Sequence, residues 1–187
     1  MTAARASMPG ASRATPWPAG PARARGAVRC MASPDRAEGR RRPVLFLDFD
    51  GVLHPSLCLE AEHFCRRPLF EEVMRRFLAV RIVISSSWRH HFALERLRPF
   101  FSGDIAERID DTTPLWVPGG PANRFEEIMA FVRSRGLDEA GWLALDDSAF
   151  EFPRDCANLV LCDGRFGLAD DSAMQLAGRL ALVTGKP

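Results

Sequence analysis

The chain has 187 residues, of which 47% are hydrophobic, so it can form one globular domain of ordinary size plus a tail. Its formal net charge is only +1, so no overall basic signature indicates a nucleic-acid-binding protein. No apolar run approaches the roughly 20 residues of a transmembrane helix, so no membrane span is expected.

Residues 1–42 differ from the rest of the chain. They are mainly Ala, Arg, Pro, Gly and Ser, and their nine Arg face only Asp35 and Glu38, so residues 43–187 carry a net charge of about −6. Few large apolar side chains are available to offset the entropy of ordering, which predicts a disordered N-terminal extension. A misplaced start codon upstream of Met31 or plain disorder is favoured over an Arg-rich transit peptide or a basic arm that contacts RNA or DNA.

The next part of the chain alternates short apolar runs with amphipathic stretches. Val44–Asp48 is apolar up to its final acid and predicts a buried strand, and Pro68–Val80 has apolar residues at helical spacing. Arg81–Ser85 predicts a second buried strand. Arg89–Leu97 predicts a helix, which the proline at position 99 would end.

The alternation continues in the second half. Ala122–Arg135 predicts a helix closed by a glycine, Trp142–Leu145 and Leu159–Leu161 predict strands, and Asp170–Val183 predicts a final amphipathic helix. Strands alternating with helices predict an α/β fold, a three-layer Rossmann-like parallel sheet with helices on both faces. In such sheets, ligands bind at the carboxyl ends of the strands.

Polar residues collect at three of these strand ends: Asp48-Phe49-Asp50-Gly51, Ser85-Ser86-Ser87 and Asp146-Asp147. A single Asp at a strand end usually caps a turn, but four acids in one crevice would repel one another unless a cation lay among them. Oxygen ligands of this kind favour Mg²⁺. The pattern therefore predicts a Mg²⁺ site in which one carboxylate attacks a substrate atom and another donates a proton.

These segments resemble the motifs of the haloacid dehalogenase (HAD) superfamily of phosphohydrolases. Leu-Asp48-Phe-Asp50-Gly51-Val52 is similar to the first motif, Ile-Val-Ile-Ser85 to the second and Leu-Ala-Leu-Asp146-Asp147 to the fourth, in an order that covers nearly all of residues 43–165. Ser-Ser-Trp88-Arg89 followed by Asp147 is also similar to a small subgroup associated with Swiss-army-knife RNA-repair proteins.

The resemblance implies a role for each acid. Asp48 would attack phosphorus and form an aspartyl-phosphate, and Asp50 would protonate the leaving oxygen and later activate the hydrolytic water. Mg²⁺ would be held by Asp48, by the backbone carbonyl of Asp50, and by Asp146 or Asp147. The function predicted in this way is a Mg²⁺-dependent phosphatase that acts on a phosphomonoester.

The resemblance also implies a set of phosphate-binding groups: Gly51, Ser85 or Ser86, and Arg89. The family usually has a Lys in its third motif, but Lys186, the only lysine here, lies next to the C-terminal residue. Arg124 lies 22 residues before Asp146, where that Lys is expected, and Arg can bind phosphate oxygens bidentately. Arg124 is therefore the predicted substitute, with Arg89 as the competitor.

Cysteines and histidines offer a second kind of chemistry. The five cysteines form no C-x-x-C pair, so neither a disulfide framework nor a four-Cys zinc site is expected, and a cytoplasmic location is the natural prediction. His54, Cys58, His63 and Cys65 follow the first motif at a spacing that matches no familiar zinc finger. We interpret them as loop or lid residues, and Trp88 as packing in the core or in a lid.

Little of the chain is left for a cap domain over the site. About 30 residues separate Gly51 from the second strand, and the loop Asp110–Gly120 is too short to form a full cap although it can fold over the site. Such a minimal cap would admit a bulky phosphorylated substrate, a small molecule or a nucleic-acid end, or be closed by the partner subunit of a homodimer. The alternative function is a non-catalytic module that binds nucleic-acid repair or stress-response proteins.

Overall fold

The structure is a computed structural model that describes residues 42–115, 119, 123–137 and 141–185. The disorder predicted for residues 1–42 falls outside these residues, apart from Arg42. Five strands form one sheet: β1 (Val44–Leu47), β2 (Arg81–Ile84), β3 (Ile109–Thr112), β4 (Trp142–Asp146) and β5 (Leu159–Leu161). Their order is β3-β2-β1-β4-β5, and every neighbouring pair is parallel.

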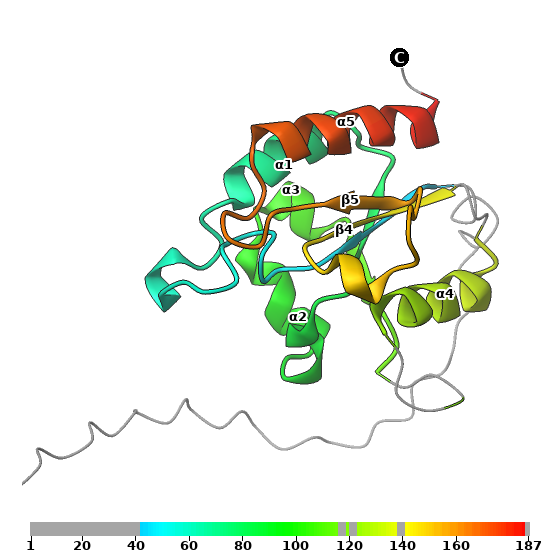
Figure 1. The fold of residues 1–187 in the computed structure, drawn as a ribbon, viewed down its shortest axis with the longest axis horizontal. Helices are drawn as coiled ribbons and strands as arrows, with labels where there is room; N and C mark the ends of the chain where they lie inside the picture. The colour runs from blue at the N-terminus through cyan, green and yellow to red at the C-terminus, as the bar shows by residue number, and fades with distance from the viewer. Residues whose placement is uncertain (1–41, 116–118, 120–122, 138–140, 186–187) are drawn as a thin grey trace, which may run out of the picture. The chain divides into compact units, whose positions relative to one another are not determined.

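Helices cover both faces of this sheet, in agreement with the predicted three-layer α/β fold. The helices are α1 (Arg67–Arg75), α2 (Leu94–Leu97), α3 (Gly103–Ala106), α4 (Arg124–Arg135) and α5 (Asp170–Thr184). In Figure 1, α1 and α5 lie on one side of the strands and α4 lies on the other. Because alternate residues of a strand face opposite ways, Leu45 and Leu47 pack into the core under α1 and α5, whereas Val44 and Phe46 pack into the core under α4.

Helix α4 has well-defined ends. Asn123 Oδ1 accepts the backbone N–H of Glu126 at 2.9 Å, and Glu126 Oε2 accepts the backbone N–H of Asn123 at 3.2 Å, which forms a capping box. At the other end Gly136 adopts a left-handed conformation with φ 59°, which favours glycine. The helix therefore begins at Arg124, two residues later than predicted, and this start places Arg124 over the carboxyl ends of the strands.

The helix predicted over Arg89–Leu97 is wrong. A 3₁₀ turn, Ser87–His90, is followed by a break and then by the short helix α2. The turn is tight because Arg89 donates hydrogen bonds back to the carbonyl groups of Ser85 and Ser86. In a similar way, the helix predicted up to Val80 ends at Arg75 with α1.

The sequence does not predict strand β3, and three of its four residues fall in the expected loop Asp110–Gly120. Among its four residues only Ile109 is fully buried, as expected of a strand at the edge of the sheet, so no apolar run indicates it. Residues 116–118 and 120 of that loop lie outside the described part of the chain.

The segment between β1 and β2 is the loop after Gly51, with one 3₁₀ turn (Glu60–Glu62), followed by α1. Within the described residues, no further domain is inserted here or between β2 and β4, as the minimal cap predicts. No helix of the described part is long and apolar enough to cross a membrane.

Candidate active site

The site lies at β1, where the order in which strands are added to the sheet reverses. The chain leaves β1 for β2 on one side, and β4 later adds to the other side of β1. Leu47 of β1 pairs with Ile84 of β2 and with Leu145 of β4. The residues that follow these three therefore lie level at the carboxyl edge of the sheet: Asp48, Ser85 and Asp146. Parallel α/β sheets bind ligands at such a switch point.

Three carboxylates meet at this edge. Asp48, Asp146 and Asp147 each offer a ligand oxygen, and these oxygens lie within 4.8 Å of one another. Asp146 Oδ1 accepts the backbone N–H of Ser148 at 2.9 Å, whereas Asp146 Oδ2 is buried and has no hydrogen-bond donor among the described residues. A buried carboxylate oxygen without a donor, grouped with two further carboxylates, fits a hard cation such as Mg²⁺.

Burial makes these anions unfavourable without a cation. It raises the pKa of Asp146 to about 7, and the negative charge of Asp48 adds to this shift. Burial also raises the pKa of Asp48, although the positive charge of Arg124 opposes the change. At neutral pH, ionisation of one of the two acids therefore disfavours ionisation of the other, unless a further positive charge binds beside them.

Two serines bind the carboxylate of Asp147, and two glycines leave room for it. Its carboxylate accepts the hydroxyl groups of Ser56 at 2.9 Å and of Ser148 at 3.0 Å. A Cβ atom at Gly51 would lie 2.0 Å from Asp147 Oδ2, and one at Gly164 would lie 2.3 Å from the same atom. Gly51 also has φ +70°, so this close approach and the turn both require glycine there. Its predicted role in phosphate binding stays a prediction.

Arg124 lies between the two buried acids. Its Nη1 is 3.3 Å from Asp48 Oδ1 and 3.5 Å from Asp146 Oδ2. Burial opposes the charge of the guanidinium, but Asp48 and Asp146 together raise its pKa. The backbone N–H of Arg124 donates to Glu151 Oε2 at 2.7 Å, which anchors the start of α4 beside the site.

Arg89 occupies a different position. It is buried, forms an ion pair with Glu127, and donates to two backbone carbonyl groups of the serine run. Glu127 Oε2 also lies 3.9 Å from Arg124 Nε, so Glu127 joins the two arginines. Among the described residues, no ion pair joins Arg89 to Asp48, Asp146 or Asp147. Of the two predicted substitutes for the lysine, Arg124 is therefore the one placed between the carboxylates.

The two candidate serines also differ. Ser86 hydrogen-bonds to Asp48, and this contact favours the ionised form of that acid. Ser86 Oγ additionally accepts the backbone N–H of Trp88 at 3.4 Å. Ser85 Oγ is buried and has no hydrogen-bond partner within the described structure. Ser86 is thus the serine that contacts the predicted nucleophile, and the phosphate-binding role of either one stays a prediction.

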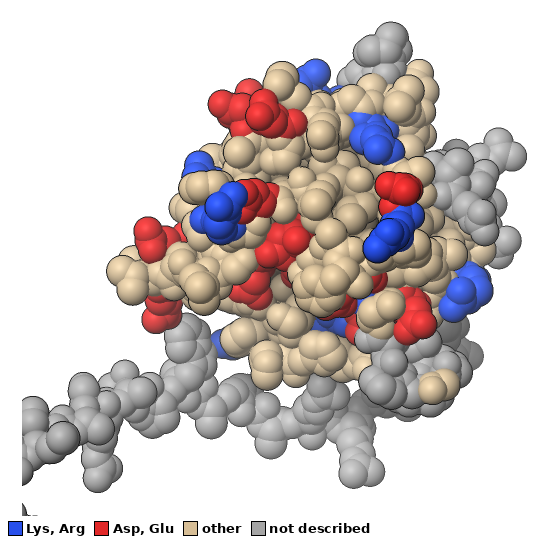
Figure 2. Space-filling model, viewed as in Figure 1, with Lys and Arg blue, Asp and Glu red and all other residues tan. Residues whose placement is uncertain are grey.

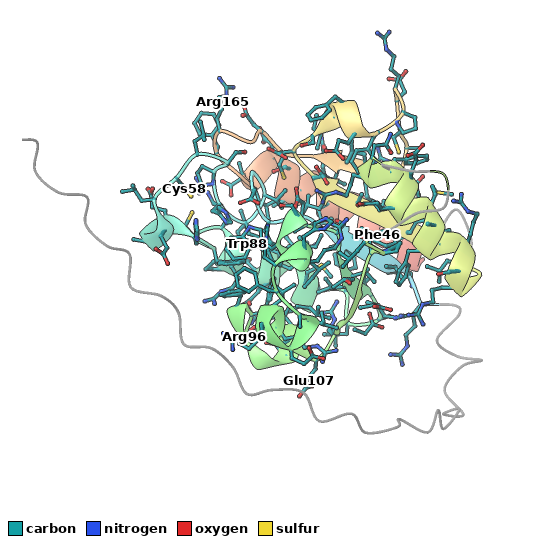
Figure 3. All side chains as sticks on the ribbon, turned by 90° about the horizontal axis from the view of Figure 1, so that it is seen from below. Phe46, Cys58, Trp88, Arg96, Glu107 and Arg165 are labelled. Atoms are coloured by element: carbon teal, nitrogen blue, oxygen red, sulfur yellow. The ribbon has the colours of Figure 1, made fainter. Side chains whose placement is uncertain are left out.

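Asp50 contacts His54 on the loop that follows β1 and Trp88 on the turn that follows β2. Asp50 Oδ2 accepts the indole N–H of Trp88 at 3.0 Å, and Asp50 Oδ1 lies 3.1 Å from Nε2 of His54. The hydrogen bond with His54 is the main cause of a lowered pKa of Asp50. Trp88, labelled in Figure 3, packs against Phe49 and several other aromatic rings, so it combines the predicted packing role with a polar contact.

Several residues of the site had no assigned role from the sequence. Glu127 could have been found, because it lies three residues after Arg124 on a predicted helix and such neighbours interact. Ser56 and Glu151 had no usable signal, because their contacts depend on how two loops meet in space. His54 was noticed as a possible metal ligand, but its contact with Asp50 was not foreseen.

Comparison with known families places the fold and this acid cluster in context. The model of the family described as "HAD domain in Swiss Army Knife RNA repair proteins" matches residues 44–173. No curated protein and no solved structure matches the chain. The matched segment contains all five strands, and membership of the HAD superfamily supports a hydrolase-type function. The chain therefore belongs to the family of HAD domains found in Swiss Army Knife RNA repair proteins.

Proposed function

We propose that this domain is a Mg²⁺-dependent phosphatase that hydrolyses a phosphomonoester, with Asp48 as the nucleophile. The observation that carries the proposal is the group of Asp48, Asp146 and Asp147, whose ligand oxygens lie within 4.8 Å, with Arg124 between two of them. Such a group combines a fixed nucleophile, a cation site and a permanent positive charge in one crevice.

The proposed reaction has two steps. A carboxylate oxygen of Asp48 forms a bond to phosphorus while the ester P–O bond breaks, and Asp50 donates a proton to the leaving oxygen. Asp50 then accepts a proton from water, whose oxygen attacks phosphorus and releases Asp48 and phosphate. The backbone N–H of Phe49, 2.8 Å from Asp48 Oδ1, and the nearby guanidinium of Arg124 orient the nucleophile.

The metal ligands of the proposal are the carboxylates of Asp48, Asp146 and Asp147, together with the backbone carbonyl of Asp50. When bound, Mg²⁺ neutralises the approach of an anionic carboxylate to an anionic phosphate. Asp146 Oδ2, which has no hydrogen-bond donor, is available for this contact. The hydroxyl groups of Ser56 and Ser148 keep Asp147 in place for it.

The proposed substrate is a bulky phosphomonoester such as a phosphorylated nucleic-acid end. The matching family is described by its RNA repair proteins, and the described residues contain no cap domain that would exclude a polymer. Figure 2 shows Arg interspersed with Asp and Glu on the face drawn, without a continuous basic strip among the described residues. On this face, the distribution favours contact with a terminal phosphate over contact with a long stretch of backbone.

The test is hydrolysis of an aryl phosphate with and without Mg²⁺ by the protein, by Asp48→Asn and by Asp171→Asn. Asp171 is an exposed acid at the start of α5 and serves as a matched control. We expect Mg²⁺-dependent turnover that falls to background in Asp48→Asn and persists in Asp171→Asn. Equal background in all three proteins would contradict the proposal and favour a non-catalytic binding module. Phosphorylated oligonucleotides, nucleotides and sugar phosphates then identify the substrate class.

A further inference from the structure

A second group of metal-ligating side chains lies beside the site, on the loop between β1 and α1. His54, Cys58 and His63 each offer a ligand atom, and these atoms lie within 4.8 Å of one another. We propose that these three residues bind Zn²⁺.

The local fold brings the three residues together. Leu59 N–H donates to Glu62 Oε2 at 2.9 Å, and His63 N–H donates to the carbonyl of Glu60 at 3.1 Å, so the chain between Cys58 and His63 forms one tight turn. That turn brings His63 back beside His54. The imidazole rings of His54 and His63 have their centroids 4.7 Å apart.

Phe64 fixes the end of this turn. It adopts φ 61°, a left-handed conformation that is uncommon for a residue other than glycine. Packing of the side chain offsets the cost of this backbone conformation. The ring of Phe64 stacks on Phe100 with centroids 4.6 Å apart and contacts Trp88 edge-on. The position of His63, next to Phe64 in the chain, is therefore set by the aromatic cluster beside the site.

The donor atoms select the metal. Two imidazole nitrogens and one thiolate sulfur suit Zn²⁺, whereas Mg²⁺ prefers oxygen. Zinc bonds of about 2.0–2.3 Å place tetrahedral ligand atoms roughly 3.3–3.8 Å apart. The limit of 4.8 Å is wider than this by about one ångström, which small rotations of the half-buried Cys58 and His63 side chains can close. Figure 3 shows Cys58 in this outer region of the ribbon, away from Phe46 in the sheet.

His54 has the contacts that a zinc-bound histidine usually has. Its Nδ1 accepts the backbone N–H of Phe64 at 3.4 Å, so Nε2 carries the hydrogen and donates to Asp50 Oδ1 at 3.1 Å. Metal-bound histidines almost always donate their second N–H to a carboxylate or a carbonyl in this way. The contact with Phe64 is at the long limit of a hydrogen bond, so little is lost if a metal takes its place at Nδ1.

Cobalt spectroscopy tests the binding site without reference to activity. Co²⁺ is added to the protein in an excess of Mg²⁺, which occupies the oxygen site. We expect thiolate-to-cobalt charge transfer and the strong visible bands of a tetrahedral ion, lost on addition of Zn²⁺. Cys58→Ser and His63→Asn lose the spectrum, whereas Cys65→Ser, which changes an exposed neighbouring thiol outside the group, keeps it. A spectrum that survives Cys58→Ser, or no spectrum at all, overturns the site.

Discussion

Arg124 provides the buried positive charge of the site. Its guanidinium faces Asp48 and Asp146, while Glu151 holds its backbone and Glu127 lies beside its side chain. A lysine would provide the same charge on a flexible stem, but Arg keeps several planar donors and cannot lose its proton. The residue therefore stabilises the acid pair at any working pH, with or without a bound metal.

Replacement of Arg124 should separate charge from geometry. Arg124→Gln leaves two buried carboxylates without their partner, so the free energy of unfolding without Mg²⁺ should fall by about 3 kcal/mol. Turnover should fall by about 10²–10³-fold. Arg124→Lys should keep most of the stability and part of the turnover. Urea unfolding and initial rates measure both effects, and equal stability of the three proteins would contradict the pairing.

Trp88 lowers the pKa of Asp50, the proposed proton donor. Its indole N–H favours the ionised form of Asp50, so Trp88→Phe should raise the pKa of Asp50. The limb of the pH profile on which kcat/KM falls as Asp50 loses its proton should then move to higher pH. Trp142→Phe is the matched control, because the indole N–H of Trp142 is buried and has no hydrogen-bond partner in the part of the chain that the structure describes. Identical profiles for Trp88→Phe and the unchanged protein would argue against this contact.

At the scale of elements, the site depends on two loops that cross at Asp147. Ser56, on the loop after β1, donates its backbone N–H to the carbonyl of Gly164, on the loop after β5, at 2.8 Å. Gly51 and Gly164 approach Asp147 Oδ2 so closely that neither position has room for a Cβ atom. Asp147, the proposed metal ligand that follows β4, is therefore positioned by loops that belong to two other strands.

Gly164→Ala should disturb this crossing. The new Cβ atom would lie 2.3 Å from Asp147 Oδ2 and 2.8 Å from Ser56 Oγ, so the carboxylate has to move. The Mg²⁺ concentration for half-maximal turnover should rise by at least about tenfold, which is 1.4 kcal/mol. Gly178→Ala in α5 meets nothing within 4 Å and should stabilise the helix by about 1 kcal/mol without changing Mg²⁺ dependence. An unchanged Mg²⁺ dependence in both variants would contradict the claim that the loops after β1 and β5 position Asp147.

Elements with strong local signals could be predicted from the sequence. β1 and β4 are buried on both faces and read as continuous apolar runs, and α4 carries its own cap residues. β3 and the break after His90 lack such signals. The acids of the site could be predicted because parallel strands end at the same edge. The contacts of Ser56 and His54 could not, because they depend on the path of loops, which has no periodicity.

At the scale of the whole molecule, the acid cluster links stability to pH and to metal. Burial and the charge of Asp48 raise the pKa of Asp146 from 3.8 to about 7 on folding. The folded protein therefore binds a proton that the unfolded chain has already released in this range. This contribution to stability is present at pH 4 and is lost as the pH rises to about 7.

Thermal unfolding should show this dependence directly. Without Mg²⁺, the Tm component due to Asp146 should fall between pH 4 and pH 7, and Asp146→Asn should remove it. Added Mg²⁺ should raise Tm more at pH 8 than at pH 5, because the metal binds the ionised carboxylates. A Mg²⁺ effect that is larger at pH 5 than at pH 8 would contradict the assignment of the cluster as the metal site.

The contact between Trp88 and Asp50 also gives the protein an optical probe of its own chemistry. The indole N–H donates to the carboxylate at 3.0 Å, and the ring of His63 lies with its centroid 5.5 Å away. Indole fluorescence responds to nearby charge, so proton gain by Asp50, metal binding at His63 and entry of a phosphate each act on the same emitter. Trp142 packs against Phe46 in the core on the other face of the sheet. Events at the centre can therefore be followed in real time without a label.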